Sequence, residues 1–243
     1  MLISADAAQL EWRTPVSLSR DSVGIDELLS GADVHSLNQA EFKLPTRLVS
    51  KTYLFRTIFR GSGWAFSKDP DFMHVSEDPD YWDAVNEKFY KKYKGLDKWH
   101  THLSTFVTAH LPIIGPTGRS WLIPMGTDPN GKPRIPWQKL TNYPVQGTGA
   151  DIVQIARISL SNRMKASTIR GCLVSTVHDS IVADVHEDDI DKMAKMMYDV
   201  FDDLPKNFQK LFNYDLIIPF PCEVKFGPNM ADMEELPREK YGY

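Results

Sequence analysis

The chain has 243 residues, of which 42% are hydrophobic and 25% charged, and its formal net charge is −4 at pH 7. This is the composition of an ordinary globular protein with one large domain or two modest ones, and it argues against a free-standing nucleic-acid binder, which is normally basic. Two cysteines and the lack of any run of about 20 apolar residues argue against a disulfide framework and a membrane span, so a reducing cytoplasm without a membrane partner is expected.

The N-terminal part of the chain begins with a predicted strand. Residues 1–5 (MLISA) are mostly apolar and end at Asp6, which is typical of a short strand. Residues 7–19 are ambiguous between strand and helix. Residues 20–34 are polar and contain glycines, so helical structure is expected only after them.

Two helices are predicted next. Residues 35–43 (HSLNQAEFK) fit one short helix, which the sequence LPTR then interrupts. A second helix, rich in aromatic residues, is expected over 47–60, with Pro45 at its beginning and Thr46 as its cap. Glycines and prolines predict a loop over 61–80.

The middle of the chain is predicted to be helical and then irregular. Residues 81–110 favour helix and carry a basic cluster of Lys88, Lys91, Lys92, Lys94 and Lys98. Residues 111–136 are rich in proline and glycine and contain the turn sequence TDPNGKP, so a short hairpin or loop is expected there.

The C-terminal part alternates helices and strands. A long helix is expected over 148–166, and residues 187–212 favour amphipathic helix. In the latter a stripe of apolar residues at helical spacing indicates core packing and not a cofactor site; its members are Met193, Met196, Met197, Val200 and Phe201. Residues 219–230 are typical of a final strand and turn.

The stretch STVHDSIVADV (175–185) predicts a hairpin with a polar tip. β-Branched and apolar residues on both sides favour two strands, and His178, Asp179 and Ser180 fit a tight turn between them. The tip either faces solvent or presents a carboxylate from a rigid hairpin. Asp6 also ends a strand, and two such carboxylates can hold two Mg²⁺ ions about 3.5–4 Å apart. Any two aspartates could be nominated in this way, so both interpretations stay open.

Four residues spaced by four along the predicted helix carry two cations and then two aromatic rings. Arg47, Lys51, Phe55 and Phe59 share one broad face, because each step of four drifts by about 40°. Such a face suits a nucleoside triphosphate, with phosphates on the cations and the sugar and base on the rings. The alternative is that the phenylalanines lie in the core and the cations are solvated.

Five segments in order resemble the motifs of the family A DNA polymerases, the DNA polymerase I family. ADAAQLEWR (5–13) resembles motif A, usually D-Y-S-Q-I-E-L-R, and DVHS (33–36) resembles the D-I-H element that follows it. LPTRLVSKTYLFRTIF (44–59) resembles motif B, R-x₃-K-x₃-F/Y-x₃-Y, in the form of phage replicative members. NYPVQGTGAD (142–151) is similar to N-x-P-x-Q-G-T-x-A-D, and VHDS (177–180) to motif C, V-H-D-E. KFGPNM (225–230) resembles the C-terminal G-x-N-W strand.

The resemblance implies a metal site and a catalytic acid. Asp6 and Asp179 would be the ligands of two Mg²⁺ ions, with the Ala7 carbonyl completing the shell. Lys51 would be the general acid for the departing pyrophosphate, and His178 would contact the primer end.

The resemblance also implies a site for the incoming dNTP. Gln9 would lie beside the nucleotide, and Glu11 would be a steric gate that leaves no room for a 2′-hydroxyl. The triphosphate would be held by His35, Arg47 and Lys51, while Phe55 and Phe59 complete the nucleotide site.

Three further residues would bind primer–template DNA by the same resemblance, namely Arg13, Asn142 and Gln146. Each has a structural alternative. Arg13 could pair with Glu11 at the surface, His35 could cap a helix, and Asn142 and Gln146 could satisfy backbone groups at the start of a helix.

The sequence departs from the family pattern at three positions. Ser180 replaces the acid that usually follows the motif C aspartate, and Phe59 replaces a tyrosine. Gln138 stands where the family usually has an arginine, and Lys139 could compensate for it. These departures put rate and fidelity in doubt more than the type of reaction.

The fold expected from the resemblance is α/β (α+β), with a palm on a small antiparallel sheet and helical fingers. The palm would comprise residues 1–19 and 138–243, and the fingers residues 20–137. The sequence begins at motif A, so a second polypeptide carrying the thumb and the rest of the palm is expected, as in a split phage polymerase in an infected bacterial cytoplasm. Whether it also carries a 3′–5′ exonuclease stays open, as does the alternative that the sequence is a fragment of one longer polymerase. The alternatives are a catalytically weak, nucleic-acid-binding scaffold subunit of a replisome, and an unrelated α/β domain with chance motifs.

Overall fold

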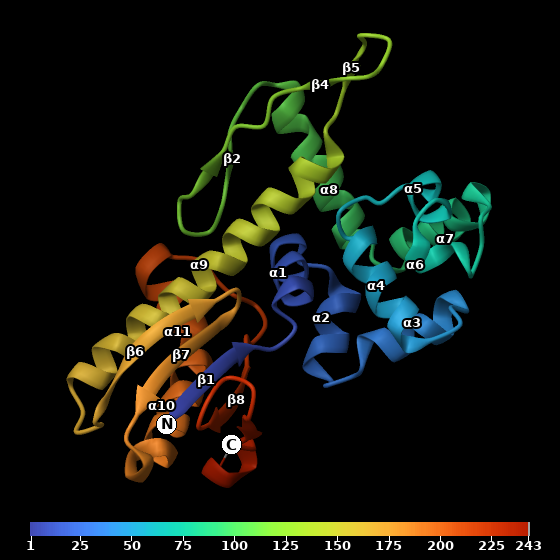
Figure 1. Cartoon of the computed structure of the whole chain (residues 1–243). Helices are drawn as coiled ribbons and strands as arrows, with labels where there is room; N and C mark the ends of the chain where they lie inside the picture. Colours follow the sequence, from blue (N-terminus) through green and yellow to red (C-terminus); the bar gives the residue numbers. More distant parts are fainter. Residues whose placement is uncertain (243) are drawn as a thin grey trace. The chain divides into compact units, whose positions relative to one another are not determined.

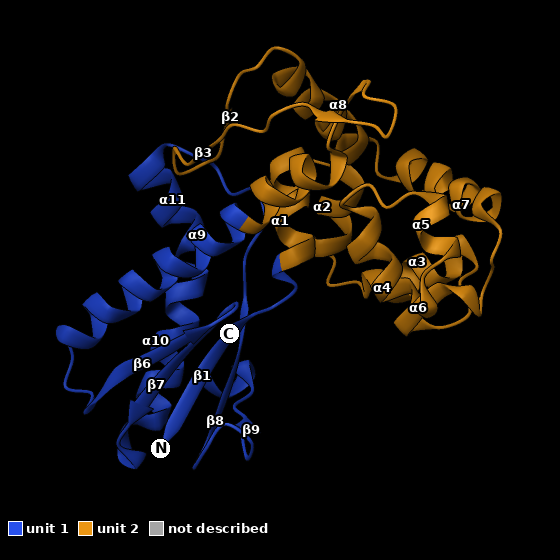
Figure 2. Ribbon diagram, turned by 45° about the horizontal axis from the view of Figure 1, so that its top comes forward, with its two compact units in different colours: residues 1–10, 147–243 blue, residues 11–146 orange. Residues whose placement is uncertain are grey.

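The computed structural model describes residues 1–242 as two compact units. One unit comprises residues 1–10 and 147–243, and the other residues 11–146 (Figure 2). Together they combine many helices with a small antiparallel sheet, as the α+β expectation requires. Among the helices of residues 1–242, none is long and apolar enough to cross a membrane.

The first unit is built on one five-stranded antiparallel sheet of order β6-β7-β1-β8-β9 (Figure 1). Its strands are β1 (Leu2–Ala7), β6 (Gly171–Val177), β7 (Ser180–Val185), β8 (Cys222–Gly227) and β9 (Glu234–Glu235). The predicted N-terminal strand and the hairpin around residue 178 are therefore confirmed. β1 lies between β7 and β8, although these three strands are far apart in sequence, so its neighbours are set by long-range pairing.

Alternation along β1 gives the sheet a covered face. Ile3 and Ala5 are fully buried on one face, because successive side chains of a strand point to opposite faces. On the other face Leu2 and Asp6 are only partly covered, and Ser4 between them is buried. The helix α10 (Ile190–Asp202) packs against β1 and β8. Most of the predicted stripe is core, as expected: Met193, Met197, Val200 and Phe201 are buried, while Met196 is only partly buried.

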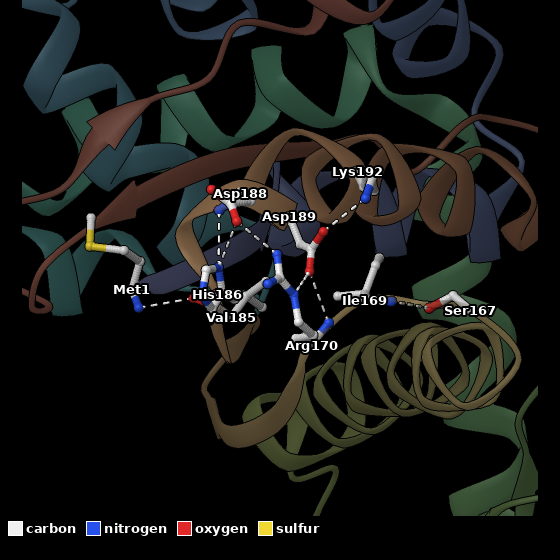
Figure 3. A network of polar contacts seen from close by, with 9 residues as sticks. All are labelled: Met1, Ser167, Ile169, Arg170, Val185, His186, Asp188, Asp189 and Lys192. Atoms are coloured by element: carbon white, nitrogen blue, oxygen red, sulfur yellow. Dashed lines mark hydrogen bonds and ion pairs between the residues drawn. The ribbon is translucent and has the colours of Figure 1, made fainter.

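The end of the sheet near the N-terminus is held by a polar network (Figure 3). Arg170 donates from Nε to Asp189 Oδ2 at 2.8 Å and from Nη2 to Asp188 Oδ2 at 3.0 Å. Lys192 Nζ lies 2.8 Å from Asp189 Oδ1. The N-terminal amino group donates to the Val185 carbonyl at 3.0 Å, so the start of β1 is fixed to the end of β7.

The helices of this unit come from the second half of the chain. α9 (Trp137–Lys165) contributes its second half to this unit, followed by α10, α11 (Leu204–Phe212) and the 3₁₀ segments at 187–189 and 238–241. Arg163 Nη2 lies 2.6 Å from Asp203 Oδ2 and joins the end of α9 to the α10–α11 junction. Both cysteines are free thiols, with Cys172 exposed and Cys222 buried.

The second unit is mainly helical. Its helices are α1 (Leu10–Ser19), α2 (Ser22–Leu29), α3 (Val34–Phe42), α4 (Arg47–Thr57), α5 (Gly63–Ser67), α6 (Pro70–Met73), α7 (Pro79–Lys92) and α8 (Lys94–Thr108). Six of them begin after a side chain that accepts a hydrogen bond from the first-turn backbone, and these caps are Asp21, Asp33, Thr46, Ser62, Asp69 and Asp78. Such caps set the starting points, since the first N–H groups of a helix have no intrahelical partner.

The core of the second unit is aromatic. Tyr53 has ring-centroid distances of 5.2 Å to Phe66 and 5.9 Å to Trp82, and all three side chains are buried. Its hydroxyl donates to Asn86 Oδ1 at 2.9 Å, so the polar end of the ring is satisfied.

A buried acid joins two helix beginnings in this unit. Asp21 caps α2 through the Gly24 N–H at 2.9 Å and accepts from the Gly95 N–H of α8 at 2.6 Å. Gly95 permits this approach, because a Cβ there would lie 2.6 Å from the Cα of Asp21. The cap of α8 therefore comes from a distant segment, because the side chain of its own N-cap residue, Tyr93, makes no capping hydrogen bond.

Two small hairpins complete the second unit, as predicted for residues 111–136. β2 (Ile113–Ile114) pairs with β3 (Ser120–Trp121), and β4 (Gly126–Thr127) with β5 (Pro133–Arg134). Gly131 in the second turn has φ 77°, a left-handed value that glycine adopts without strain.

Several predicted boundaries are wrong. The helix α2 lies within 20–34, and α5 and α6 lie within the predicted loop 61–80, since capping aspartates and serine start short helices there. The predicted helix 81–110 is two helices that meet at Tyr93. α9 begins at Trp137 and not at 148. The helix includes Pro144, although proline has no backbone N–H to donate to the preceding turn.

Candidate active site

Asp6 and Asp179 lie side by side at one end of β1. Asp6 is the last residue but one of the strand and pairs with Ser180 of β7, so the hairpin tip is brought to it. The Ala7 N–H donates to the Asp179 carbonyl at 3.1 Å. His178 adopts φ 54°, a left-handed value in which histidine is enriched among non-glycine residues, and its side chain is exposed. The chain thus turns tightly between β6 and β7 and leaves Asp179 next to Asp6.

The surroundings of Asp6 disfavour its negative charge. Burial raises the pKa of its carboxyl above the usual value, and the charges of Asp179 and Glu223 raise the pKa further. Lys225 acts in the opposite direction. Carboxylates that repel one another at a partly buried site are stabilised by a cation between them.

Glu223 and Lys225 are not among the residues predicted from sequence. They lie on β8, where Glu223 is the cross-strand partner of Asp6 and Lys225 that of Ser4. Lys225 Nζ is 3.7 Å from Glu223 Oε2. The alternating segment CEVKFG places both on one face of the strand, but only the register of β8 against β1 shows which residue they face.

Ser180 does not present its side chain as an acid would. It is buried, and its hydroxyl donates to the Val177 carbonyl across the hairpin at 2.9 Å. The residue that replaces the family's second acid therefore closes the turn.

The residues implied in metal binding lie on β1 and in the turn between β6 and β7, and Gln9 follows β1. Gln9 is exposed and has φ 55° between β1 and α1. Within residues 1–242, no three acidic, histidine or cysteine side chains converge to hold a metal by themselves. A pair of carboxylates nevertheless fits Mg²⁺, which typically takes one or two carboxylates together with substrate phosphates and water.

In the second unit a bidentate ion pair orients Arg47. Its guanidinium lies 2.6 Å (Nε) and 3.0 Å (Nη2) from the two oxygens of Asp33. Ser36 Oγ donates to the same carboxylate at 2.6 Å. These bonds hold the pKa of Asp33 far below its usual value and raise that of Arg47. The side chain of Arg47 is 55% exposed, so this oriented cation remains open to an anion.

His35, Lys51 and Phe55 lie together beside this pair. The His35 and Phe55 rings are 5.8 Å apart in an edge contact, and Lys51 Nζ lies 5.9 Å from the Phe55 centroid. Burial lowers the pKa of His35, and the neighbouring Arg47 lowers it further. A lowered pKa leaves the imidazole neutral at pH 7, so it can bind an anion only through a ring N–H.

The prediction that Phe59 continues this helix face is wrong. α4 ends at Thr57, and the backbone turns through Arg60, which has φ 61°. Thr46, by contrast, caps α4 as predicted through the Val49 N–H at 3.2 Å.

Glu11 and Gln146 are joined directly. Gln146 Nε2 donates to Glu11 Oε1 at 3.2 Å. Arg13 follows on α1, and burial lowers its pKa to about 10. Asn142 is half-buried on α9, two residues before Pro144. The alternative that Arg13 lies on the surface is wrong, because this residue is only 8% exposed.

Comparisons with known proteins cover nearly the whole chain. The family described as DNA polymerase family A matches residues 1–232. The DNA polymerase of Bacillus phage SP01 is 24% identical over 97% of this chain and 26% of its own length. DNA polymerase I of Chloroflexus aurantiacus is 22% identical over 96% of this chain and 24% of its own length.

A solved structure has the same fold. It is the POL domain of Pol1 from M. smegmatis in complex with DNA primer-template and dNTP, with a TM-score of 0.78 at 19% identity. The likeness covers 93% of this chain and 39% of that one. The chain spans about a quarter of the length of these two curated relatives. With a family match over residues 1–232, the chain belongs to DNA polymerase family A.

Proposed function

We propose that this chain carries the polymerising centre of a template-directed DNA polymerase. It would transfer a deoxynucleotide from a dNTP to a primer 3′-hydroxyl and release pyrophosphate. The observation that carries the proposal is the juxtaposition of Asp6 and Asp179 at the end of β1, with the pKa of Asp6 raised by burial and by its acidic neighbours. The family match over residues 1–232 supports it.

Asp6, Asp179 and the Ala7 carbonyl would hold two Mg²⁺ ions. These ions would lower the pKa of the attacking hydroxyl and stabilise the charge of the leaving pyrophosphate. The crowded carboxylates fit this role, because a cation relieves the repulsion that raises the pKa of Asp6.

Residues of the second unit would bind the triphosphate. Arg47, oriented by Asp33, would pair with phosphate oxygens, and Lys51 would add a second charge and donate a proton to the departing pyrophosphate. Neutral His35 would donate one hydrogen bond, while Phe55 would stack on the nucleotide.

Glu11 would select deoxynucleotides by occupying the space of a 2′-hydroxyl. Its hydrogen bond to Gln146 supports a fixed carboxylate position. Gln9 would adjoin the nucleotide, whereas the predicted contact of Phe59 loses its support because Phe59 lies beyond the end of α4. The primer–template contacts would come from Arg13, Asn142, Gln146 and His178.

The palm would comprise residues 1–19 and 138–243, and the fingers residues 20–137. The phage replicative type and the infected bacterial cytoplasm stay predictions. A partner polypeptide with the thumb and the rest of the palm is supported by β6, an edge strand on which Val174 and Val177 are 51% and 46% exposed. Exposed apolar edges are normally covered.

The test is incorporation of a single dNTP into a labelled primer–template with Mg²⁺. The chain is assayed alone and with lysate from cells expressing neighbouring replication genes. We expect Asp179→Asn to lower the rate about 1,000-fold, because loss of a metal ligand removes several kcal/mol of transition-state stabilisation.

The matched control is Asp184→Asn, an exposed aspartate on β7 at the other end of the strand. It should keep the wild-type rate. Extension by the chain alone would refute the need for a partner. No extension in any mixture by a folded chain would refute the catalytic proposal.

The second candidate is a nucleic-acid-binding subunit with little or no catalysis. The observation in its favour is Ser180, whose hydroxyl bonds within the hairpin where the family's second acid would stand. This candidate predicts primer–template binding without incorporation, even when a partner is present.

A further inference from the structure

Two adjoining hollows in the second unit are lined by cations that play no part in the proposed centre. One has a volume of about 660 Å³ and lies where the end of α7 and the start of α8 meet the start of α2. The other, of about 590 Å³, lies along the first turns of α8 and the end of α1. They share Ser22, Lys94 and Gly95 as lining residues, so they form one continuous depression, called the lysine furrow below.

The walls of the lysine furrow are strongly basic in a chain whose net charge is −4. Six cationic side chains and two carboxylates line it. One of the two acids, Asp21, is buried and is used by the backbone N–H groups of Gly24, Gly95 and Leu96. The other, Glu41, is exposed. The furrow therefore carries a local excess of positive charge.

The cations differ in whether the fold already uses them. Lys92 is mostly buried and bonded at 2.8 Å both to Glu27 and to Asn38, which ties α7 to α2 and α3. Lys91 pairs with Glu87 at 2.9 Å. Arg20 and Lys94, by contrast, are exposed, and within residues 1–242 neither has an acidic partner.

The same holds for Lys88 and Lys98, which are exposed and have no acidic partner in the described part of the chain. Unpaired cations grouped along a depression repel one another. Such a group is stabilised by a polyanion whose charges are spaced along its length.

One wall adds aromatic rings to these charges. Trp99 is half-buried and His102 is exposed, and both line the second hollow beside Arg20 and Lys98. Trp99 also packs against the core of α8 and the hairpins, so its ring is held in place. A fixed aromatic ring beside phosphate-binding cations is typical of surfaces that bind single-stranded nucleic acid, since unpaired bases stack on the ring. In duplex DNA the base faces are already stacked on one another, and the side chains of an acidic peptide have no flat ring to stack on Trp99.

We propose that the lysine furrow binds single-stranded nucleic acid, with phosphates on Lys94 and Lys98 and a base stacked on Trp99. Binding would be independent of base sequence and sensitive to salt. It does not depend on the proposed catalytic centre, because none of these residues belongs to it.

The test measures anisotropy of a fluorescent twelve-residue oligothymidylate titrated with the full chain in EDTA at several salt concentrations. We expect Lys94→Gln/Lys98→Gln to weaken binding roughly ten-fold at about 100 mM salt. The slope of log K against log salt should become less steep by about 1.4, since each single-strand phosphate contact contributes about 0.7. The control Lys68→Gln/Lys210→Gln removes two exposed lysines elsewhere and should change neither quantity.

Trp99→Leu separates stacking from charge. It should weaken binding at least about five-fold and leave the salt slope unchanged, because base–aromatic stacking does not involve counterions. Trp99→Phe should restore most of the affinity. Circular dichroism melts of each variant show that it is folded.

Wild-type affinity and slope in the folded double-lysine variant would overturn the proposal. The proposal would also be overturned if polyglutamate binding required the same two lysines and the Trp99→Leu variant bound the oligonucleotide normally. That result would indicate an acidic protein partner. Since this assay contains no Mg²⁺ or dNTP, its result is separate from that of the incorporation assay.

Discussion

In the unit of residues 1–10 and 147–243, strand pairing places the charged residues of the candidate site, whereas in the unit of residues 11–146 helix caps and side-chain pairs place them. Asp6 faces Ser180 and Glu223 because β1 lies between β7 and β8. Arg47 is directed by Asp33, which is also the cap of α3. A shift of register would move every side chain of the strand, while loss of a cap or a pair changes a local group.

This difference explains the opposite charge character of the two parts. Carboxylates crowded by the sheet keep their unfavourable interaction, because the backbone pairing of several strands outweighs it. In the helical unit the cation Arg47 is paired with Asp33, which stabilises its charge. The carboxylate pair therefore calls for an added cation, and the helical unit presents an oriented cation for an added anion.

The largest expected effect tests whether caps hold the second unit. Asp21→Ala removes the acceptor for three backbone N–H groups at the beginnings of α2 and α8. Asp21 is only 2% exposed, so these N–H donors would be left buried without an acceptor. We expect the free energy of unfolding to fall by about 2–3 kcal/mol. Hydrogen exchange should show faster exchange over residues 11–146.

Asp26→Ala is the matched control, since Asp26 is exposed on the same helix and should have an effect within about 0.5 kcal/mol. If Asp21→Ala speeds exchange equally in the strands β1 and β7, the two units unfold together. The contrast between local and long-range placement would then not extend to stability.

A smaller effect tests the side-chain pair. Arg47→Lys keeps the charge but loses the planar fork that binds Asp33 through two nitrogens. We expect KM for dNTP to rise about ten-fold, with a smaller change in kcat, because orientation of the cation is lost while its charge remains. Steady-state single-nucleotide incorporation measures both constants.

Arg56→Lys serves as the control, because Arg56 lies on the same helix and pairs with Asp71. An equal rise of KM in both variants would show that any weakening of α4 has this effect, and that the Asp33–Arg47 pair has no special part in it.

Local signals made parts of both units predictable from sequence. Thr46 marked the beginning of α4, and the β-branched residues around His178 marked the hairpin. The helix α2 carries a capping signal in Asp21, but the polar residues and glycines of the surrounding segment 20–34 conceal it. The sequence predicts the start of α9 too late, because Pro144 lies inside this helix and proline normally breaks helices.

Other features depend on contacts between distant segments and could not be predicted in this way. Glu223 and Lys225 face the Asp6 row of β1 only through the register of β8. The cap of α8 by Asp21 joins residues more than seventy positions apart. The lysines of the furrow form a cluster in the sequence. The sequence does not show which of them form ion pairs in the folded chain, as Lys91 and Lys92 do.

The smallest effect concerns the carboxylate pair and depends on pH. The pKa of Asp6 is raised above its ordinary value of 3.8, so the folded state holds this proton more tightly than the unfolded state. Stability from this group is complete at pH below about 3.8 and is lost as pH rises through the raised pKa. Asp6→Asn should therefore raise the melting temperature in EDTA by about one to two degrees at pH 7, with no gain near pH 3.

Added Mg²⁺ should raise the melting temperature of the wild type and of Asp184→Asn, and should leave that of Asp6→Asn unchanged. A lower melting temperature for Asp6→Asn at pH 7 would mean that the carboxylate stabilises the sheet. The repulsion between the crowded carboxylates would then not destabilise this unit, and a metal ion would have no repulsion to offset.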